Sequence, residues 1–488
     1  MTLAIGGVVL YLALGVIGFL VRPQWICGVL AILAGSVSLA LWAPGFPEEA
    51  LGGGGWGIPV AGDPWALGMW ALALVVHGAV LLHERARPGA FHPVLTLLVG
   101  SCLAAVVSGD LFNLYVTLEL VSLLSFILVG YEGQPRAVWA GLQYLILATV
   151  GMTLYLLGVG LVYGKLGTLS LSAIAALGRG LSDPAVAIGA GLLVAGAAIK
   201  GGVFLFGLWL PPAHGYAPTG VSVVLSAVVV KTGVVALARL AAAFPVGPIL
   251  VAIGILTGFG GLVYALWERD LKVFLAFSTV SQLGYILIGL GLGGQALLGA
   301  ILYAVAHGLF KGLLFLAAGQ AIEETGEREI ASLVGRLSWP TALGLAVGTW
   351  AIAGLPPLAG FAAKGALTAD LSPMARAVLG ALSVGTAALC ARLIPLLRPG
   401  PKGTASPGGV TVLIVSLVGF GLWGFLRLPG LLAPGKWAEA VGEALGGYGL
   451  YLLLRRVRPP LPRITLDRAT VLALLGATAL VAGILLLG

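Results

Sequence analysis

Long apolar segments, separated by short stretches rich in charged residues, proline or glycine, occupy most of the 488-residue chain. A helix needs about 20 mostly apolar residues to cross a lipid bilayer. The mean hydropathy of +1.09, with 59% hydrophobic and 9% charged residues, is incompatible with a water-soluble domain of this length. The sequence therefore predicts an all-α, multi-pass (polytopic) protein of the cell membrane.

Charged residues, proline and glycine mark the ends of the expected helices. The segments cover residues 4–21, 26–43, 65–82, 91–108, 111–130, 138–163, 186–209, 220–241, 248–267, 272–291, 296–319, 341–366, 376–397 and 410–428. The tail leaves two alternatives open. The arginines that follow residue 454 favour two further spans, 437–454 and 470–488. The alternative, which Glu439 and Glu443 support, is that 437–454 lies along the membrane interface. We expect 14 to 16 transmembrane helices.

Positive residues in short loops indicate orientation, because such loops stay on the cytoplasmic side. Alternate loops lie on the same side of the membrane, and the loops of one side carry the basic residues: Arg22, residues 83–87, Arg136, residues 269–272, Arg398 and Lys402. The opposite side carries Glu48, Glu49 and Asp63. This pattern places the N-terminus outside. If residues 437–454 span the membrane, the arginines that follow are cytoplasmic: Arg455, Arg456, Arg458 and Arg463.

Several classes of function are disfavoured by composition. The net charge of +8 is scattered over loops, so we expect no nucleic acid partner. Cys27, Cys102 and Cys390 are far apart and form no CxxC pair, which argues against a metal site or a disulfide framework. Paired histidines for haem and a glycine fingerprint are missing, so we expect no cofactor and no redox centre of the chain's own. The 76 glycines indicate close helix packing.

Ionisable residues inside the apolar segments require an explanation, since placing one there costs about 2.5 to 3.5 kcal/mol or more. They are Glu119, Lys200, Lys231, His307, Lys311 and Lys364. His307 precedes Lys311 by one helical turn, so both project from one face. Buried lysine, glutamate and histidine can exchange protons near neutral pH. The alternatives are a packed histidine and lysines that reach the headgroups, and the second alternative suits Lys364 best.

Two of the lysines lie at predicted helix breaks. Lys200 is followed by Gly201, Gly202, Gly207 and the Pro211-Pro212 pair, and Lys364 is preceded by Gly354, Pro356, Pro357 and Gly360. Interrupted membrane helices must face protein or a wet cavity. A pair of interrupted helices in two halves indicates a transporter with inverted repeats, although ordinary proline kinks give the same pattern.

Five motifs in this order resemble the antiporter-like subunits shared by respiratory complex I, Mrp cation/proton antiporters and membrane-bound hydrogenases. The motifs are GDLFNLYVTLEL at 109–120, WLPPAHGYAPTGVSVVLSAVVVKTG at 209–233, DLKVFLAFSTVSQLGY at 270–285, AHGLFKGLLFLAAG at 306–319 and AGLPPLAGFAAK at 353–364. The resemblance covers roughly residues 90–400 and is closest to an Mrp D-type subunit. It implies N-terminal helices at 1–90, inverted five-helix repeats at 91–245 and 246–400, and C-terminal helices at 401–488.

The resemblance also implies roles for the buried residues. Glu119 and Lys200 match the family's glutamate and lysine pair, and Lys231 matches the bridging lysine. His307 and Lys311 match the motif of the second half, and Lys364 matches the lysine of the second broken helix. One departure is that Leu205 and Gly207 stand where the family commonly has proline and histidine, so the first break must depend on glycine.

The leading hypothesis is a proton-translocating subunit that works with other membrane subunits of a hetero-oligomeric complex in the lipid bilayer. That complex is either an antiporter or a proton-translocating oxidoreductase to which the chain contributes no redox centre. Sodium, which calls for several oxygen ligands, would pass through a partner subunit. The alternatives are a stand-alone transporter of a small solute and a scaffold subunit that transports nothing.

Overall fold

The computed structural model describes residues 3–42, 49–52, 57–177, 183–400, 406–457, 461–462 and 465–486. The chain forms two compact units. One contains Met1–Trp209, Val228–Leu250 and Ile464–Gly488, and the other contains Leu210–Ala227 and Val251–Arg463. Four of the predicted orientation charges lie outside the described residues: Glu48, Lys402, Arg458 and Arg463.

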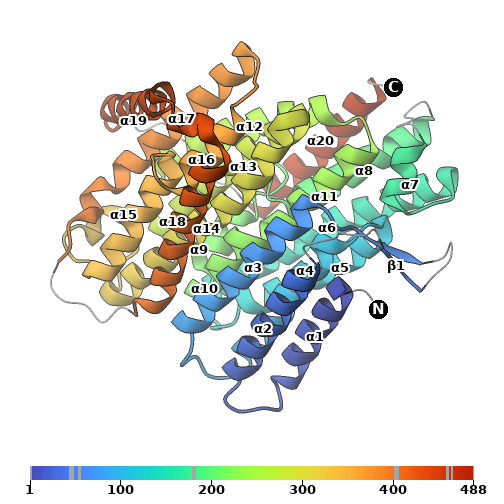
Figure 1. Ribbon diagram of the computed structural model, residues 1–488, viewed down its shortest axis with the longest axis horizontal. Coiled ribbons are helices and arrows are strands. Elements are labelled where there is room, and N and C mark those ends of the chain that lie inside the picture. Colours follow the sequence, from blue (N-terminus) through green and yellow to red (C-terminus); the bar gives the residue numbers. More distant parts are fainter. Residues whose placement is uncertain are drawn as a thin grey trace. The chain divides into compact units, whose positions relative to one another are not determined.

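The first unit is a bundle of helices from the N-terminal half, joined by one helix from the C-terminus (Figure 1). Its helices are α1 (Leu3–Ile17), α2 (Trp25–Trp42), α3 (Pro64–His83), α4 (Phe91–Val107), α5 (Leu111–Val129), α6 (Pro135–Leu166), α7 (Leu171–Ala176), α8 (Pro184–Lys200), α11 (Val230–Ala243) and α20 (Leu466–Leu485). A hairpin of β1 (Glu49–Leu51) and β2 (Ile58–Val60) joins α2 to α3, with Ala50 opposite Pro59. Although α20 is remote in sequence, it packs along α8.

The second unit is also helical. It contains α9 (Leu210–Tyr216), α10 (Thr219–Val224), most of α12 (Gly247–Trp267), α13 (Leu271–Leu292), α14 (Gly294–Thr325), α15 (Trp339–Ala353), α16 (Ala359–Leu367), α17 (Pro373–Leu393), α18 (Gly408–Arg427) and α19 (Pro434–Leu454), with the 3₁₀ turns η3 (Ile330–Leu333), η4 (Ile394–Leu397) and η5 (Pro429–Leu432). Helices α13 and α14 form its core. Every residue of the most apolar window of α13 is buried, and 89% of that of α14.

Aspartates determine where several helices begin. The carboxylates of Asp63, Asp110, Asp183 and Asp270 accept hydrogen bonds from backbone N–H groups in the first turns of α3, α5, α8 and α13. These N–H groups have no partner within their own helix, so the side chain supplies one. Proline follows Asp63 and Asp183 directly, at a position where its missing N–H costs nothing.

The predicted all-α, multi-pass membrane fold is confirmed. Among the described residues, eleven helices are long and apolar enough to cross a membrane, and Ala4–Ile17, Phe91–Val107 and Pro184–Lys200 are shorter apolar helices. Helices lie at each predicted segment, including α19 and α20 in the tail. The total of 14 to 16 spans and the inverted repeats stay predictions. Glycine packs helices closely, as expected, because a β-carbon added to Gly284 of α13 would lie 2.5 Å from Gly258 Cα of α12.

Both predicted helix breaks are present. Helix α8 ends at Lys200, and Gly202 then adopts φ +69°, a left-handed conformation that suits glycine. Helix α15 ends at Ala353, Gly354 has φ +78°, and α16 starts at Ala359. A third irregularity was not predicted: the expected helix at 220–241 contains a π-helical segment, η2 (Leu225–Val229), between α10 and α11.

One stretch in each unit has the same local construction. In the first, Asp110 before α5 forms a β-bridge with Ser170 after α6, and in the second, Asp270 before α13 forms one with Glu329 after α14. Helices α6 and α14 each contain 32 residues and each end at a left-handed glycine. The two hairpins of long helices are therefore closed at their ends in the same way.

Candidate functional site

Lys200 is the last residue of α8, and its side chain is only 2% exposed. Its ammonium donates hydrogen bonds to the backbone oxygen of Leu118, at 2.9 Å, and to the hydroxyl of Ser122. Both acceptors belong to α5. The ammonium also lies 5.7 Å from the ring centroid of Tyr144 on α6. Neutral oxygen atoms and an aromatic ring therefore surround this buried positive charge.

Glu119 follows Leu118 on α5 and is partly buried. Within the described part of the chain no ion pair joins Glu119 to Lys200, although the two charges attract each other at longer range. Next to Glu119, α5 exposes Val116 by 47% and Leu120 by 39%. The carboxylate thus borders an apolar face of α5 that the described residues leave uncovered.

Lys231 is the second residue of α11, the helix that follows the π-helical segment, and is 1% exposed. Helix α11 approaches the end of α8 very closely. A β-carbon added to Gly233 would lie 2.2 Å from the backbone nitrogen of Gly201. Because glycine lacks that atom, the backbones that carry Lys200 and Lys231 come together.

His307 and Lys311 both lie in α14, and both are fully buried. The Lys311 ammonium donates to the backbone oxygen of Leu275, at 2.8 Å, and to the hydroxyl of Ser278. Both acceptors belong to α13. The acceptor pair is therefore of the same kind as in the first unit: one carbonyl and one serine hydroxyl on a neighbouring helix. The His307 ring packs edge-on against Phe310, with centroids 5.3 Å apart.

A chain of uncharged polar side chains runs through the core of the second unit. The Tyr303 hydroxyl of α14 donates to the side-chain oxygen of Gln282 on α13. The Gln282 amide donates to the Thr386 hydroxyl of α17 at 3.0 Å, and the Tyr285 hydroxyl lies 3.3 Å from the hydroxyls of both Thr386 and Ser383. All five residues are buried. This chain was not predicted, although Gln282 and Tyr285 lie three residues apart on one face of α13.

Lys364 lies in α16, after the second helix break, with 9% of its surface exposed. Its ammonium donates to the backbone oxygen of Ala353 at 3.0 Å. This carbonyl is available because α15 ends there. The ammonium lies 5.6 Å from the ring centroid of Tyr285. Lys364 and the chain of polar side chains therefore share this tyrosine.

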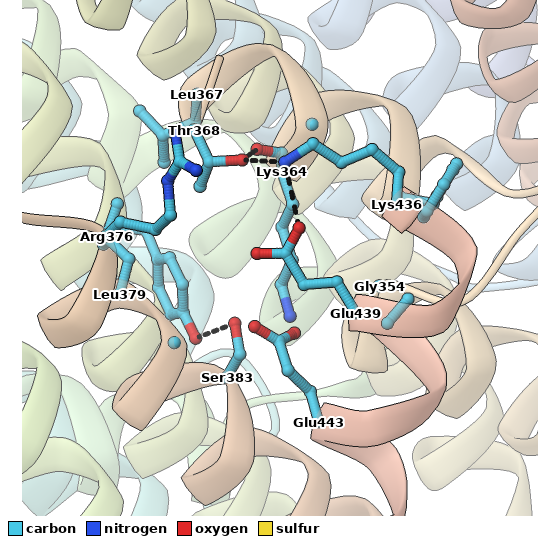
Figure 2. A pocket seen from close by; sticks show the side chains of 15 residues that line it. Gly354, Lys364, Leu367, Thr368, Arg376, Leu379, Ser383, Lys436, Glu439 and Glu443 are labelled. Carbon is cyan, nitrogen blue, oxygen red and sulfur yellow. Dashed lines mark hydrogen bonds and ion pairs between the residues drawn. The ribbon is translucent and has the colours of Figure 1, made fainter. Parts of the chain in front are cut away.

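A pocket opens beside Lys364, lined by residues of α13, α16, α17 and α19 (Figure 2). Its cavity volume is about 40 Å³. Figure 2 shows the Glu443 carboxylate pointing toward the Lys364 ammonium and the Ser383 hydroxyl. Lys436 and Glu439 also line the pocket and form an ion pair at 3.0 Å.

Ion pairs outside the spans fix the loops. Arg328 donates two hydrogen bonds to Asp270, at 2.5 and 3.1 Å, which ties the end of α14 to the start of α13. Lys165 lies 3.1 Å from Asp183 and lowers the pKa of the Asp183 carboxyl. Because Asp183 also caps α8, this pair joins the last turn of α6 to the start of the helix that ends at Lys200.

The predicted site residues thus form one set in each unit. The first set is Glu119, Lys200 and Lys231, and the second is His307, Lys311 and Lys364. Among the described residues, no group of three or more His, Cys, Asp or Glu side chains is placed to hold a metal ion. Each set consists of groups that can bind and release protons.

These features define a multi-pass membrane protein of the antiporter-like class. The family described as "NADH:quinone oxidoreductase/Mrp antiporter, TM" matches residues 108–390, and the chain belongs to this family. The family predicted from the five motifs is therefore confirmed, and all five motifs fall within the matched residues.

Relatives come from more than one branch of the family. The chain is 34% identical over 445 residues to NADH-quinone oxidoreductase subunit N of Desulforudis audaxviator, covering 85% of this chain and 82% of that protein. It is 31% identical over 330 residues to the D-type subunit of the Na(+)/H(+) antiporter of Alkalihalophilus pseudofirmus, covering 64% of this chain and 66% of that protein. A chain in the structure of the Mrp complex from Dietzia sp. DQ12-45-1b superposes with a TM-score of 0.76 at 26% identity, over 98% of this chain and 60% of that chain.

Proposed function

We propose that the chain is a proton-translocating subunit of a multisubunit membrane complex, either an Mrp-type cation/proton antiporter or a related NADH dehydrogenase or hydrogenase complex. The observation that carries this proposal is the shared environment of Lys200 and Lys311. Each buried ammonium donates hydrogen bonds to a backbone carbonyl and a serine hydroxyl. When such a lysine loses its proton, no buried carboxylate is left without its partner, so both protonation states are accessible.

In this proposal the proton enters near Lys200, passes to Lys231, continues through His307 and Lys311, and leaves near Lys364. Glu119 controls the first step, because its negative charge stabilises the ammonium form of Lys200. When Glu119 turns away, Lys200 releases its proton to the next group. The proton moves between existing groups, so the step needs no oxidant or cofactor.

The repeats are part of the proposal. We assign residues 91–245 and 246–400 to two inverted five-helix repeats, with N-terminal helices at 1–90 and C-terminal helices at 401–488. The matching closure of the α5–α6 and α13–α14 hairpins supports this assignment. So do the helix breaks beside Lys200 and Lys364. The basic loops support an N-terminus on the outside of the membrane.

Partner subunits belong in the same proposal. The relatives named above are subunits of NADH-quinone oxidoreductase and of Na(+)/H(+) antiporters. A neighbouring subunit that covers the apolar face of α5 would meet Glu119 at its edge, which gives the neighbour a means of moving this carboxylate. Sodium, where a complex transports it, would pass through a partner.

The experiment replaces Lys200 or Glu119 with alanine in the complex within its own membrane. Transport is measured as acidification of inverted vesicles by a pH-sensitive dye, and assembly by native electrophoresis. We expect loss of transport with normal assembly for both variants. Arg136→Ala, which changes an exposed basic residue at the start of α6, is the control and should transport normally.

Three results would contradict the proposal. Normal transport in both alanine variants would remove the mechanism. Full function after replacing Lys200, Lys231 and Lys311 with methionine would indicate a scaffold subunit. Transport of an organic solute by the purified chain alone in liposomes would indicate a stand-alone transporter.

A further inference from the structure

Helix α19 runs beside α17, and the two helices point in the same direction. Gly380 of α17 lies beside Glu443, and Val384 lies beside Gly446, so residue numbers rise together along the contact. A β-carbon added to Gly447 would lie 2.3 Å from Ala387 Cβ, which shows how closely the helices approach. Since α17 is long and apolar enough to span the membrane, α19 lies parallel to a spanning helix.

This packing turns one face of α19 toward the pocket beside Lys364. Glu443 is partly buried on that face, and its strongest attraction is to the Lys364 ammonium. The cavity volume of about 40 Å³ exceeds the 10–15 Å³ or so that one water requires. No ion pair joins Glu443 to Lys364 within the described residues, so one or more water molecules can bridge them.

The pocket is also connected to the interior. Tyr285 and Ser383 line it, and they are the last members of the polar chain that begins at Tyr303. The other charged groups around the pocket are paired or exposed: Lys436 pairs with Glu439, and Arg376 is an exposed residue of α17. Glu443 is therefore the carboxylate that faces both the buried lysine and the end of the polar chain.

We propose that Glu443 is a proton-transfer residue, the carboxylate within this chain that exchanges a proton with Lys364 at the end of the second set. This inference rests on the proposed function and implies that α19 spans the membrane. In the exchange, a water molecule in the pocket relays one proton from the Lys364 ammonium to the Glu443 carboxylate. The ammonium and the carboxylate become two neutral groups, an amine and a carboxylic acid, and the net charge of the pocket does not change. Glu443 then gives up the proton on the open side of the pocket.

The test compares Glu443→Gln with Glu439→Gln in the assembled complex. Both substitutions remove one carboxylate from α19, but Glu439 is one turn away and pairs with Lys436. We expect Glu443→Gln to lower the rate of proton transport at least tenfold, and Glu439→Gln to lower it less than twofold. Glu443→Asp should restore part of the rate, because it returns an ionisable carboxyl group.

A chemical readout separates proton transfer from a structural role. Carbodiimides modify protonated carboxyl groups in apolar surroundings, so peptide mass spectrometry should find Glu443 modified. Lys364→Met should increase this modification, because the lysine no longer holds the carboxylate in its charged form. A purely structural Glu443 would show no such dependence on Lys364.

The outcomes distinguish this inference from the proposed function. If Lys200→Ala and Lys364→Ala stop transport but Glu443→Gln transports normally, the role of Glu443 is wrong and the proposed function stands. If neither lysine variant impairs transport, the proposed function fails, and this inference fails with it. Equal losses in Glu443→Gln and Glu439→Gln would also overturn the inference, since the effect would then not depend on facing Lys364.

Discussion

Replacing Gly233 with alanine should move Lys200 and Lys231 apart without changing any ionisable residue. The new β-carbon would start 2.2 Å from the Gly201 nitrogen, 2.5 Å from Gly201 Cα and 2.7 Å from the Lys200 carbonyl carbon. All three atoms are backbone, so no side chain can rotate away. Ordinary contact begins at 3.4 Å, and the helices must separate by 3.4 − 2.2 = 1.2 Å near this point.

The size of the effect follows from that displacement. Overpacking a tight contact costs about 1–3 kcal/mol, which a large helical bundle can absorb without unfolding. A displacement of about 1 Å between reacting groups can slow a reaction about 100-fold. We therefore expect Gly233→Ala to assemble at near-normal levels and to transport protons about 100-fold more slowly, because the backbones carrying Lys200 and Lys231 move apart.

The assay is vesicle acidification, with assembly measured by native electrophoresis and thermal stability by unfolding in detergent. Gly160→Ala in α6 is the matched control, since a β-carbon there meets nothing within 4 Å. The control should be neutral or more stable by about 0.5–1 kcal/mol, because alanine favours the helix. If Gly233→Ala transports as fast as Gly160→Ala, the close contact of α8 and α11 has no part in proton transfer.

Three further predictions concern single contacts. Ser278→Ala removes the hydroxyl acceptor of Lys311 and should lower the free energy of unfolding by about 1.5–3 kcal/mol, measured by thermal unfolding. A change within experimental error would show that this hydroxyl does not stabilise the Lys311 ammonium. Thr386→Val interrupts the polar chain at constant shape and should slow vesicle acidification several-fold with normal assembly; an unchanged rate would exclude the chain from the path. Lys165 lowers the pKa of the Asp183 carboxyl. The ion pair of these two residues therefore contributes fully to stability above about pH 4, and this contribution is lost as the pH falls through the lowered pKa of Asp183. Asp183→Asn keeps a capping side chain and should flatten the acid side of the stability profile, and an unchanged profile would refute this assignment.

The helices could be predicted from sequence because a bilayer imposes a simple requirement of length and apolarity. The breaks beside Lys200 and Lys364 were predictable for a similar reason, since glycine and proline act locally on the backbone. The π-helical segment before Lys231 was not predictable. Its sequence, LSAVV, is as apolar as its neighbours, so nothing local indicates the change from α-helical to π-helical hydrogen bonding.

The buried lysines could be found from sequence, but their acceptors could not. A charge inside an apolar segment is rare and costly, and therefore conspicuous. Ser122 and Ser278 are small polar residues of a kind common in membrane helices, and nothing local distinguishes a serine that holds an ammonium. Glu443 was conspicuous in the sequence, but its charge served only as support for the alternative of an interfacial helix. The packing of α19 against α17 could not be predicted, because the contact residues are about sixty positions apart.

The two serine and carbonyl sites are not copies of each other. If α6 and α14 are aligned from their first residues, Pro135 and Gly294, Met152 occupies the position of Lys311 in α14. Lys200 instead projects from the end of α8 onto α5. In the proposed repeats the acceptors therefore lie on matching helices, α5 and α13, but the lysines reach them from helices that do not match, α8 and α14. Since the proposed repeats alone would not produce this arrangement twice, it fits a physical requirement: a buried lysine that exchanges protons needs acceptors strong enough to hold its charge and weak enough to release it.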